Sequence, residues 1–397
     1  MILLYMWIFG YIFYKKLHAL SRYKRQILIS FFIIYIVAMV AYELYVENSV
    51  GWEYGIPYDN DTGWIFRAAD AMHSGISWDR LYLLVTSSLD YDLSNRALSI
   101  SNLGQYLYAA WVSSAIYYPT IFDIHVNLYL FYVVQCMMVF IAGIDLSNTV
   151  LAIQNRIEKP KKIPYISVCF AFLFCPIIQF SAYKLLRESI YLLLMVELLA
   201  IAIQENTGKK YLKCGVLSTL CLLIRPLTIV YIVPLLAYYI FHKRIGSIVN
   251  MALCGILLAG SSIVHYIGNL LGWAYNIGAV NLSEMVHLLL FPNVMNQFEN
   301  LVHLARDPSW VTIEYFLQSV WNIPYVVLAF LGFILMRKRT SDWSFWSILF
   351  LNCLMFYSIP YSIEYLTPRY KLIFIVPLFY FIAVGLSLIS KRVRVSI

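Results

Sequence analysis

The amino-acid sequence predicts an all-α protein, a polytopic bundle of membrane-spanning helices. Of its 397 residues, 61% are hydrophobic and 13% are charged, and the mean hydropathy is +0.73. Soluble globular domains contain about 45–50% apolar residues, so this composition excludes an ordinary soluble fold. Apolar runs of about 15–25 residues recur along the chain, which is the length that an α-helix needs to cross a bilayer. The alternating segments of a transmembrane β-barrel do not occur.

The apolar runs predict about eleven membrane spans within a single integral membrane domain, residues 1–397. The spans are expected at residues 1–14, 27–46, 124–144, 165–183, 188–203, 214–224, 227–241, 245–267, 319–336, 343–360 and 371–389. A further apolar stretch, 104–118, is interpreted as a re-entrant or interfacial helix. The spans 214–224 and 227–241 meet at Arg225-Pro226, where the proline ends the first helix.

The distribution of lysine and arginine predicts the orientation of the chain. Most of the 29 cations fall in short segments at 15–25, 156–162, 209–213, 243–244, 337–339 and 391–394. These segments share one side of the membrane only if 104–118 does not cross it fully, and cationic loops favour the cytoplasmic side. The N-terminus is therefore expected in the periplasm and the C-terminus in the cytoplasm. The net charge of +8 reflects this topology and not nucleic-acid binding.

Two long loops are expected on the outer side, at 47–103 and 268–318, and the first is rich in acids. Asp59 and Asp61 precede residues 62–74, whose apolar positions recur at the spacing of an amphipathic helix on the membrane surface. Asp61 could cap that helix, or it could be a catalytic carboxylate, with Asp59 as the alternative. The pair could also chelate a divalent cation, but two carboxylates are a weak metal signal. No cofactor and no metal ligand are assigned.

Basic residues at the outer ends of three spans predict an anion site. Insertion of an arginine into a membrane costs about 2.5–3.5 kcal/mol of free energy, so its presence at a span end needs an explanation. Anchoring of the helix at the membrane interface is one explanation. Arginine forks that hold a phosphate or pyrophosphate are another, and we favour it because three span ends contribute. The predicted substrate-binding residues are Lys184, Arg187, Glu188, Arg225, Arg369 and Lys371.

Several segments resemble, in order along most of the chain, landmarks of GT-C-type glycosyltransferases and of the related O-antigen and capsule polymerases. They are "DTGWIFRAADAMHSG", "KLLRESIYLLL", "CLLIRPLTIVYIVP" and "TPRYKLIFIVPLFYF". The resemblance implies a GT-C-like fold and a base carboxylate in the first outer loop, which carries over to Asp61 or Asp59. An extra short N-terminal span and the lack of a large soluble C-terminal domain are more similar to the polysaccharide polymerases.

These features together predict an inverting glycosyltransferase of the bacterial inner membrane that acts at its periplasmic face. A polyprenyl-(pyro)phosphate-linked sugar or oligosaccharide would be the donor, and a glycan or lipid-linked glycan the acceptor, in the assembly of lipopolysaccharide O-antigen or capsule. Transfer of one sugar and polymerisation of repeat units both stay open. The alternative is a lipid-linked glycan flippase or another multi-span transporter. Against a transporter, the span centres carry little charge beyond Glu197, and no internal repeat is visible.

Overall fold

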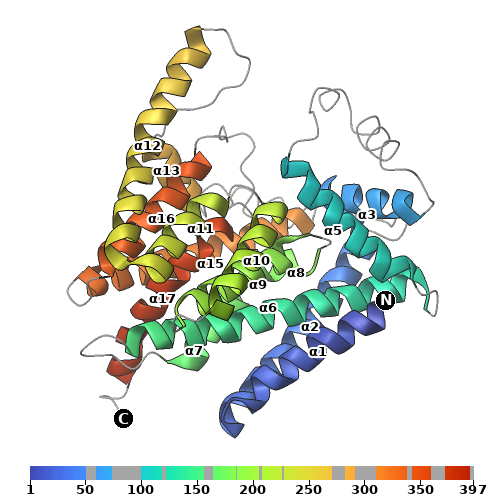
Figure 1. Ribbon diagram of the computed structural model, residues 1–397. Coiled ribbons are helices and arrows are strands. Elements are labelled where there is room, and N and C mark those ends of the chain that lie inside the picture. The colour runs from blue at the N-terminus through green and yellow to red at the C-terminus, as the bar shows by residue number, and fades with distance from the viewer. Residues whose placement is uncertain are drawn as a thin grey trace. The chain divides into compact units, whose positions relative to one another are not determined.

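A computed structural model shows helices, and no strand, among the residues that it describes (Figure 1). These residues are 1–50, 60–73, 100–118, 122–155, 164–184, 186–204, 208–225, 228–270, 282–290, 310–337, 342–358 and 372–393. The helices are α1 (Ile2–His18), α2 (Arg22–Val50), α3 (Asn60–His73), α5 (Ile100–Tyr117), α6 (Ile124–Asn155), α7 (Tyr165–Leu173), α8 (Pro176–Ala182), α9 (Glu188–Ala202), α10 (Gly208–Ile224), α11 (Ile229–Leu236), α12 (Lys243–Leu270), α13 (Leu282–Leu290), α15 (Trp310–Arg337), α16 (Trp343–Ser358) and α17 (Leu372–Val393). A π-helical turn, η2 (Ala237–Phe241), continues α11.

The all-helical class is confirmed for the described residues, and each predicted span coincides with a helix or a helix pair. Four helical segments are long and apolar enough to cross a membrane: Arg22–Val46, Ile124–Ile153, Lys243–Ser262 and Phe316–Arg337. Counting the bent pair α7–α8 as one span raises this number to five. Shorter apolar helices cover Ile229–Phe241, Trp343–Phe356 and Phe374–Ser387. Eleven crossings therefore stay a prediction.

The helix ends differ from the predicted ones in two ways. The stretch 165–183 is not one straight span, because α7 and α8 meet at an angle of 59°. Pro176 opens α8, and a proline both lacks an N–H group and disfavours helical geometry at the residue before it. The two predicted outer loops also contain more helix than expected, since α2 ends only at Val50 and α15 already begins at Trp310. Polar residues extend these helices because backbone hydrogen bonds continue past the apolar run.

The chain divides into two compact units that share several helices. Unit 1 comprises Met1–Ile144, Ile178–Leu194 and Thr219–Pro226, and unit 2 comprises Asp145–Ile177, Met195–Ser218 and Leu227–Ile397. Helices α6, α8, α9 and α10 each contribute residues to both units. The predicted single membrane domain stays a prediction.

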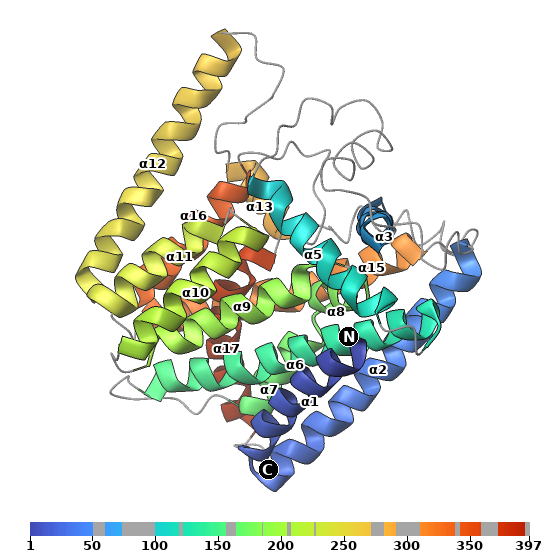
Figure 2. The same ribbon diagram turned by 45° about the vertical axis from the view of Figure 1, so that its right-hand side comes forward.

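Aromatic side chains hold unit 1 together. Phe140 of α6 packs edge to face against Phe13, Phe32 and Tyr35, at centroid distances of 6.0, 5.1 and 5.3 Å. This geometry is favourable because the positive edge of one ring meets the negative face of the other. Trp111 of α5 packs in the same way against Tyr5 of α1. Helices α1, α2, α5 and α6 thus share one aromatic core, while α3 lies beside α5 in both views (Figure 1, Figure 2).

In unit 2, glycines allow α15 and α17 to cross at very short range. A Cβ atom at Gly332 would overlap the carbonyl oxygen of Phe381, and one at Gly385 would overlap that of Leu328. Small residues at such crossings are typical of membrane helices, where close backbone packing replaces the hydrophobic effect. Helices α12 and α16 of the same unit are joined by a hydrogen bond, which the side-chain amide of Asn352 in α16 donates to the backbone oxygen of Asn250 in α12 at 2.8 Å.

Replacement of Gly332 by alanine is expected to destabilise the protein by about 1–3 kcal/mol, because the added methyl group must push two backbones apart. Gly255 of α12 is the matched control, since a Cβ atom there meets nothing within 4 Å. Alanine at Gly255 should stabilise its helix by up to about 1 kcal/mol. Melting curves of the two purified variants should therefore shift in opposite directions, and equal shifts would contradict the close crossing.

Candidate functional site

Two oppositely charged residues of the predicted site form a buried ion pair in unit 1. The Arg225 guanidinium donates from its Nη2 atom to Glu188 Oε1, and the residues are only 8% and 1% exposed. Glu188 is the first residue of α9, and Arg225 follows the last residue of α10. The guanidinium also lies 5.4 Å from the centre of the Tyr191 ring, in cation–π geometry. A buried charge needs such partners, because desolvation would otherwise exclude it.

Arg187 joins the same cluster through the backbone. Its Nη1 atom donates to the carbonyl oxygen of Ile224 at 2.7 Å, and this carbonyl belongs to the last turn of α10. Basic side chains commonly satisfy the unpaired carbonyls at helix C-termini. Gly104 of α5 lies directly against the backbone of Leu223 and Ile224, where any Cβ atom would overlap it. The start of α9, the end of α10 and the first half of α5 therefore meet at one place.

Lys184 lies on the connection that carries Arg187 and Glu188. It is half-buried in the turn after α8, and its carbonyl oxygen accepts the Leu186 N–H at 2.7 Å. The structure thus brings together Arg187, Glu188 and Arg225 and places Lys184 on the same short connection. Arg369 and Lys371 lie outside the described residues, as does Asp59.

Asp61 lies inside α3, which begins at Asn60. The capping interpretation of Asp61 is wrong as a statement of position, because Asp61 is the second residue of the helix and not the residue before it. The predicted helix over 62–74 is confirmed as α3 (Asn60–His73). The side chains of Ile65 and Ala68 are buried, so the face of α3 that carries them is directed into unit 1.

The far end of α3 is fixed to α5 by Tyr117. The Tyr117 hydroxyl donates to Asp70 Oδ1 at 3.0 Å, and the His73 ring stacks on the Tyr117 ring at 4.5 Å with an interplanar angle of 8°. Burial, and then the hydrogen bond with Asp70, raise the pKa of Tyr117 above its ordinary value. The hydroxyl therefore stays protonated and remains a donor.

Sequence reasoning missed several polar residues beside the ion pair. Gln135 of α6 accepts a hydrogen bond from Ser189 through Oε1 at 3.2 Å, and the Tyr108 ring of α5 packs 6.4 Å from the ring of Phe131 on α6. Tyr132 lies one helical turn before Gln135. The glutamine within the apolar run "VVQCMM" could have revealed this cluster, because polar residues in membrane spans usually face other helices.

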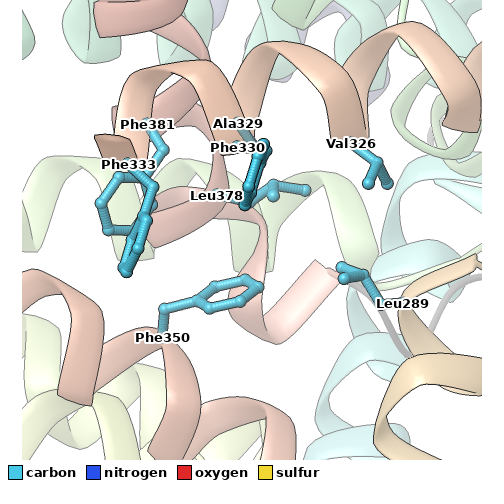
Figure 3. A pocket seen from close by; sticks show the side chains of 8 residues that line it. All are labelled: Leu289, Val326, Ala329, Phe330, Phe333, Phe350, Leu378 and Phe381. Carbon is cyan, nitrogen blue, oxygen red and sulfur yellow. The ribbon is translucent and has the colours of Figure 1, made fainter. Parts of the chain in front are cut away.

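Unit 2 contains a cavity of about 240 Å³ (Figure 3). Its lining is wholly apolar and comes from α13, α15, α16 and α17: Leu289, Val326, Ala329, Phe330, Phe333, Phe350, Leu378 and Phe381. Because the lining offers no polar atom, the cavity is suited to hydrocarbon.

The part of the chain that the structure describes contains no metal-binding site. Within it, no three histidine, cysteine, aspartate or glutamate side chains come together as ligands. Comparison of the chain with protein-family models, with characterised proteins and with solved structures finds no match. The case for a function therefore rests on the chemistry of the cluster in unit 1.

Proposed function

We propose that the protein is a membrane glycosyltransferase that uses a sugar or oligosaccharide linked to polyprenyl phosphate or pyrophosphate. The observation that carries this proposal is the cluster of Arg187, Glu188 and Arg225 in unit 1. Two arginines and a carboxylate from separate helix ends form a rigid basic site beside α5. Helix α3, which carries Asp61, packs on the same α5.

In the proposed reaction, the aspartate of the first outer loop and the arginines of the cluster have different roles. Asp61, or Asp59 in its place, accepts the proton of the acceptor hydroxyl while that oxygen bonds to the anomeric carbon. The bond between the anomeric carbon and the phosphate oxygen breaks, and the leaving phosphate keeps the electron pair. The arginines stabilise the growing negative charge. A guanidinium carries five N–H donors, so the bond with Glu188 orients Arg225 and does not by itself use up its capacity.

The apolar cavity of unit 2 supports a lipid-linked donor. A polyprenyl chain is hydrocarbon, and the cavity offers it four phenylalanine rings and no polar lining atom. Figure 3 shows Phe330, Phe333, Phe350 and Phe381 around this space. The proposal also includes the topology: about eleven crossings in a GT-C-like bundle, the N-terminus and both long loops in the periplasm, and the C-terminus in the cytoplasm of a bacterium.

A transporter or lipid-linked glycan flippase is the second candidate, and one observation favours it. The 59° break between α7 and α8 is a broken helix, and broken helices are frequent at the substrate sites of transporters. A flippase moves the donor across the bilayer without cleaving the bond between sugar and phosphate, so the two functions differ in their products.

Reconstitution in liposomes tests the proposal. With a polyprenyl-pyrophosphate-linked oligosaccharide from the source bacterium on the outer leaflet, the enzyme should release polyprenyl pyrophosphate and form a longer glycan. Translocation of the intact donor without any new glycosidic bond would contradict the enzyme and support the flippase. A deletion strain separates the two enzyme classes: a polymerase mutant should keep a single repeat unit, and a single-sugar transferase mutant should lose one sugar from every unit.

A further inference from the structure

Five buried polar side chains of unit 1, here called the polar ring, lie on the neighbouring helices α5, α6 and α9: Tyr108, Tyr132, Gln135, Glu188 and Ser189. The Ser189 hydroxyl donates to Gln135 Oε1 at 3.2 Å, and Ser189 follows Glu188 in α9. The Tyr108 ring of α5 packs against Phe131 of α6 at a centroid distance of 6.4 Å, and Phe131 directly precedes Tyr132. Tyr132 and Gln135 lie one turn apart on α6.

Three atoms of the polar ring lack a hydrogen-bond partner among the described residues. They are the hydroxyl oxygens of Tyr108 and Tyr132 and the Nε2 atom of Gln135. These side chains are 4%, 0% and 0% exposed. Roughly 90% or more of buried polar groups in proteins are paired, so each of these three atoms needs an explanation. Phenylalanine and methionine would fill the same space without the free-energy cost of burying an unpaired polar group.

The chemistry of the three atoms identifies the missing partner. An amide nitrogen only donates, so Gln135 needs an acceptor, whereas a tyrosine hydroxyl can both donate and accept. A neutral ligand rich in hydroxyl groups satisfies all three atoms.

We infer that Tyr108, Tyr132 and Gln135 bind hydroxyl groups of a neutral sugar unit of the substrate, next to the Glu188–Arg225 pair. The inference rests on the proposed function and adds to it the residues that bind the sugar. The position of Gln135 fits, because Ser189, which bonds to Gln135, directly follows Glu188 in α9. The arginines would then hold the phosphate while the polar ring holds the sugar attached to it.

Removal of the polar atoms tests this inference, because structural and ligand-binding groups respond differently. The variants are Tyr108→Phe, Tyr132→Phe and Gln135→Met, which keep the shape of each side chain. In the substrate-free protein the two phenylalanine variants should melt at the same temperature as the wild type or higher, because an unsatisfied buried group is removed. Gln135→Met also removes the acceptor of the Ser189 hydroxyl, so only its glycan product is compared. Glycan product per folded molecule, measured in the deletion strain, should fall by about 2- to 12-fold for each lost hydrogen bond.

Tyr183→Phe is the matched control in unit 1. Its hydroxyl is also buried but donates to the backbone oxygen of Tyr35 at 3.0 Å, so its removal should lower the melting temperature and leave the product unchanged. The inference is overturned if the two phenylalanine variants lose as much thermal stability as Tyr183→Phe, since their groups would then be structural or held by water. It is equally overturned if all three variants fold and make normal glycan. A wild-type protein that makes no glycan at all would instead show that the proposed function itself has failed.

Discussion

Replacement of Asp61 by asparagine is expected to lower glycan product by about 10²–10⁴-fold, which is the usual contribution of a positioned general base. Asparagine has nearly the same size but cannot accept the proton of the acceptor hydroxyl. The cost in stability should be small, because an acid in the first turn of a helix gains only about 0.3–1 kcal/mol from the helix dipole. Glycan product and the amount of folded protein should therefore separate, and both can be measured in the same membranes.

Asp70→Asn is the control for this experiment because it changes the same residue type on the same helix. Nine residues, or two and a half turns, separate Asp61 from Asp70, so the two positions lie on opposite faces of α3. Asp70 is exposed and bonds to Tyr117, so its replacement should weaken the docking of α3 and leave proton transfer intact. Asp59→Asn tests the alternative base. Full activity of both the Asp61 and the Asp59 variants would contradict the assignment and direct attention to Glu284, Glu299 and Asp307.

The positions of the helices could be predicted from sequence because each follows an apolar run. Their ends could not, since hydropathy reports where a helix is apolar, and backbone hydrogen bonds decide where it stops. The helix predicted over 319–336 begins nine residues earlier, at Trp310. The break at Pro176 was available in the sequence, but the uninterrupted apolar run around it favoured one span.

The candidate site could likewise be predicted only in part. The cost of placing arginine at the end of a span identified Arg187 and Arg225 as residues that need a partner, and the structure gives both of them one. The identity of the partners could not be predicted, because Glu188 and the Ile224 carbonyl reach them through tertiary packing. Tyr108 and Tyr132 could not be recognised for a different reason: tyrosine is common in apolar spans, and the sequence does not show which hydroxyl groups are buried without a hydrogen-bond partner.

Replacement of Arg225 by alanine is expected to destabilise the protein by about 3–5 kcal/mol. The variant leaves the Glu188 carboxylate buried without the guanidinium that now bonds to it. Lys243→Ala provides the comparison, because Lys243 pairs with Asp342 at 2.8 Å but is 61% exposed. Exposed pairs contribute about 0–1 kcal/mol, so its melting temperature should hardly change. Similar losses for the two variants would contradict the buried ion pair.

The double variant Arg225→Met/Glu188→Met separates a structural ion pair from a binding site. Removal of both residues leaves neither charge buried without the other, and well-packed apolar replacements of buried pairs are often neutral or stabilising by about 1–4 kcal/mol. The double variant should therefore melt near the wild-type temperature. If Arg225 also holds the leaving phosphate, glycan product should still fall by about 10- to 150-fold, because a charge-assisted hydrogen bond of about 1.5–3 kcal/mol is lost. Arg225→Lys should restore only part of the product, since an ammonium group lacks the planar fork. A double variant that is both stable and fully active would show that the pair serves the fold alone, and the phosphate would then have to be bound elsewhere.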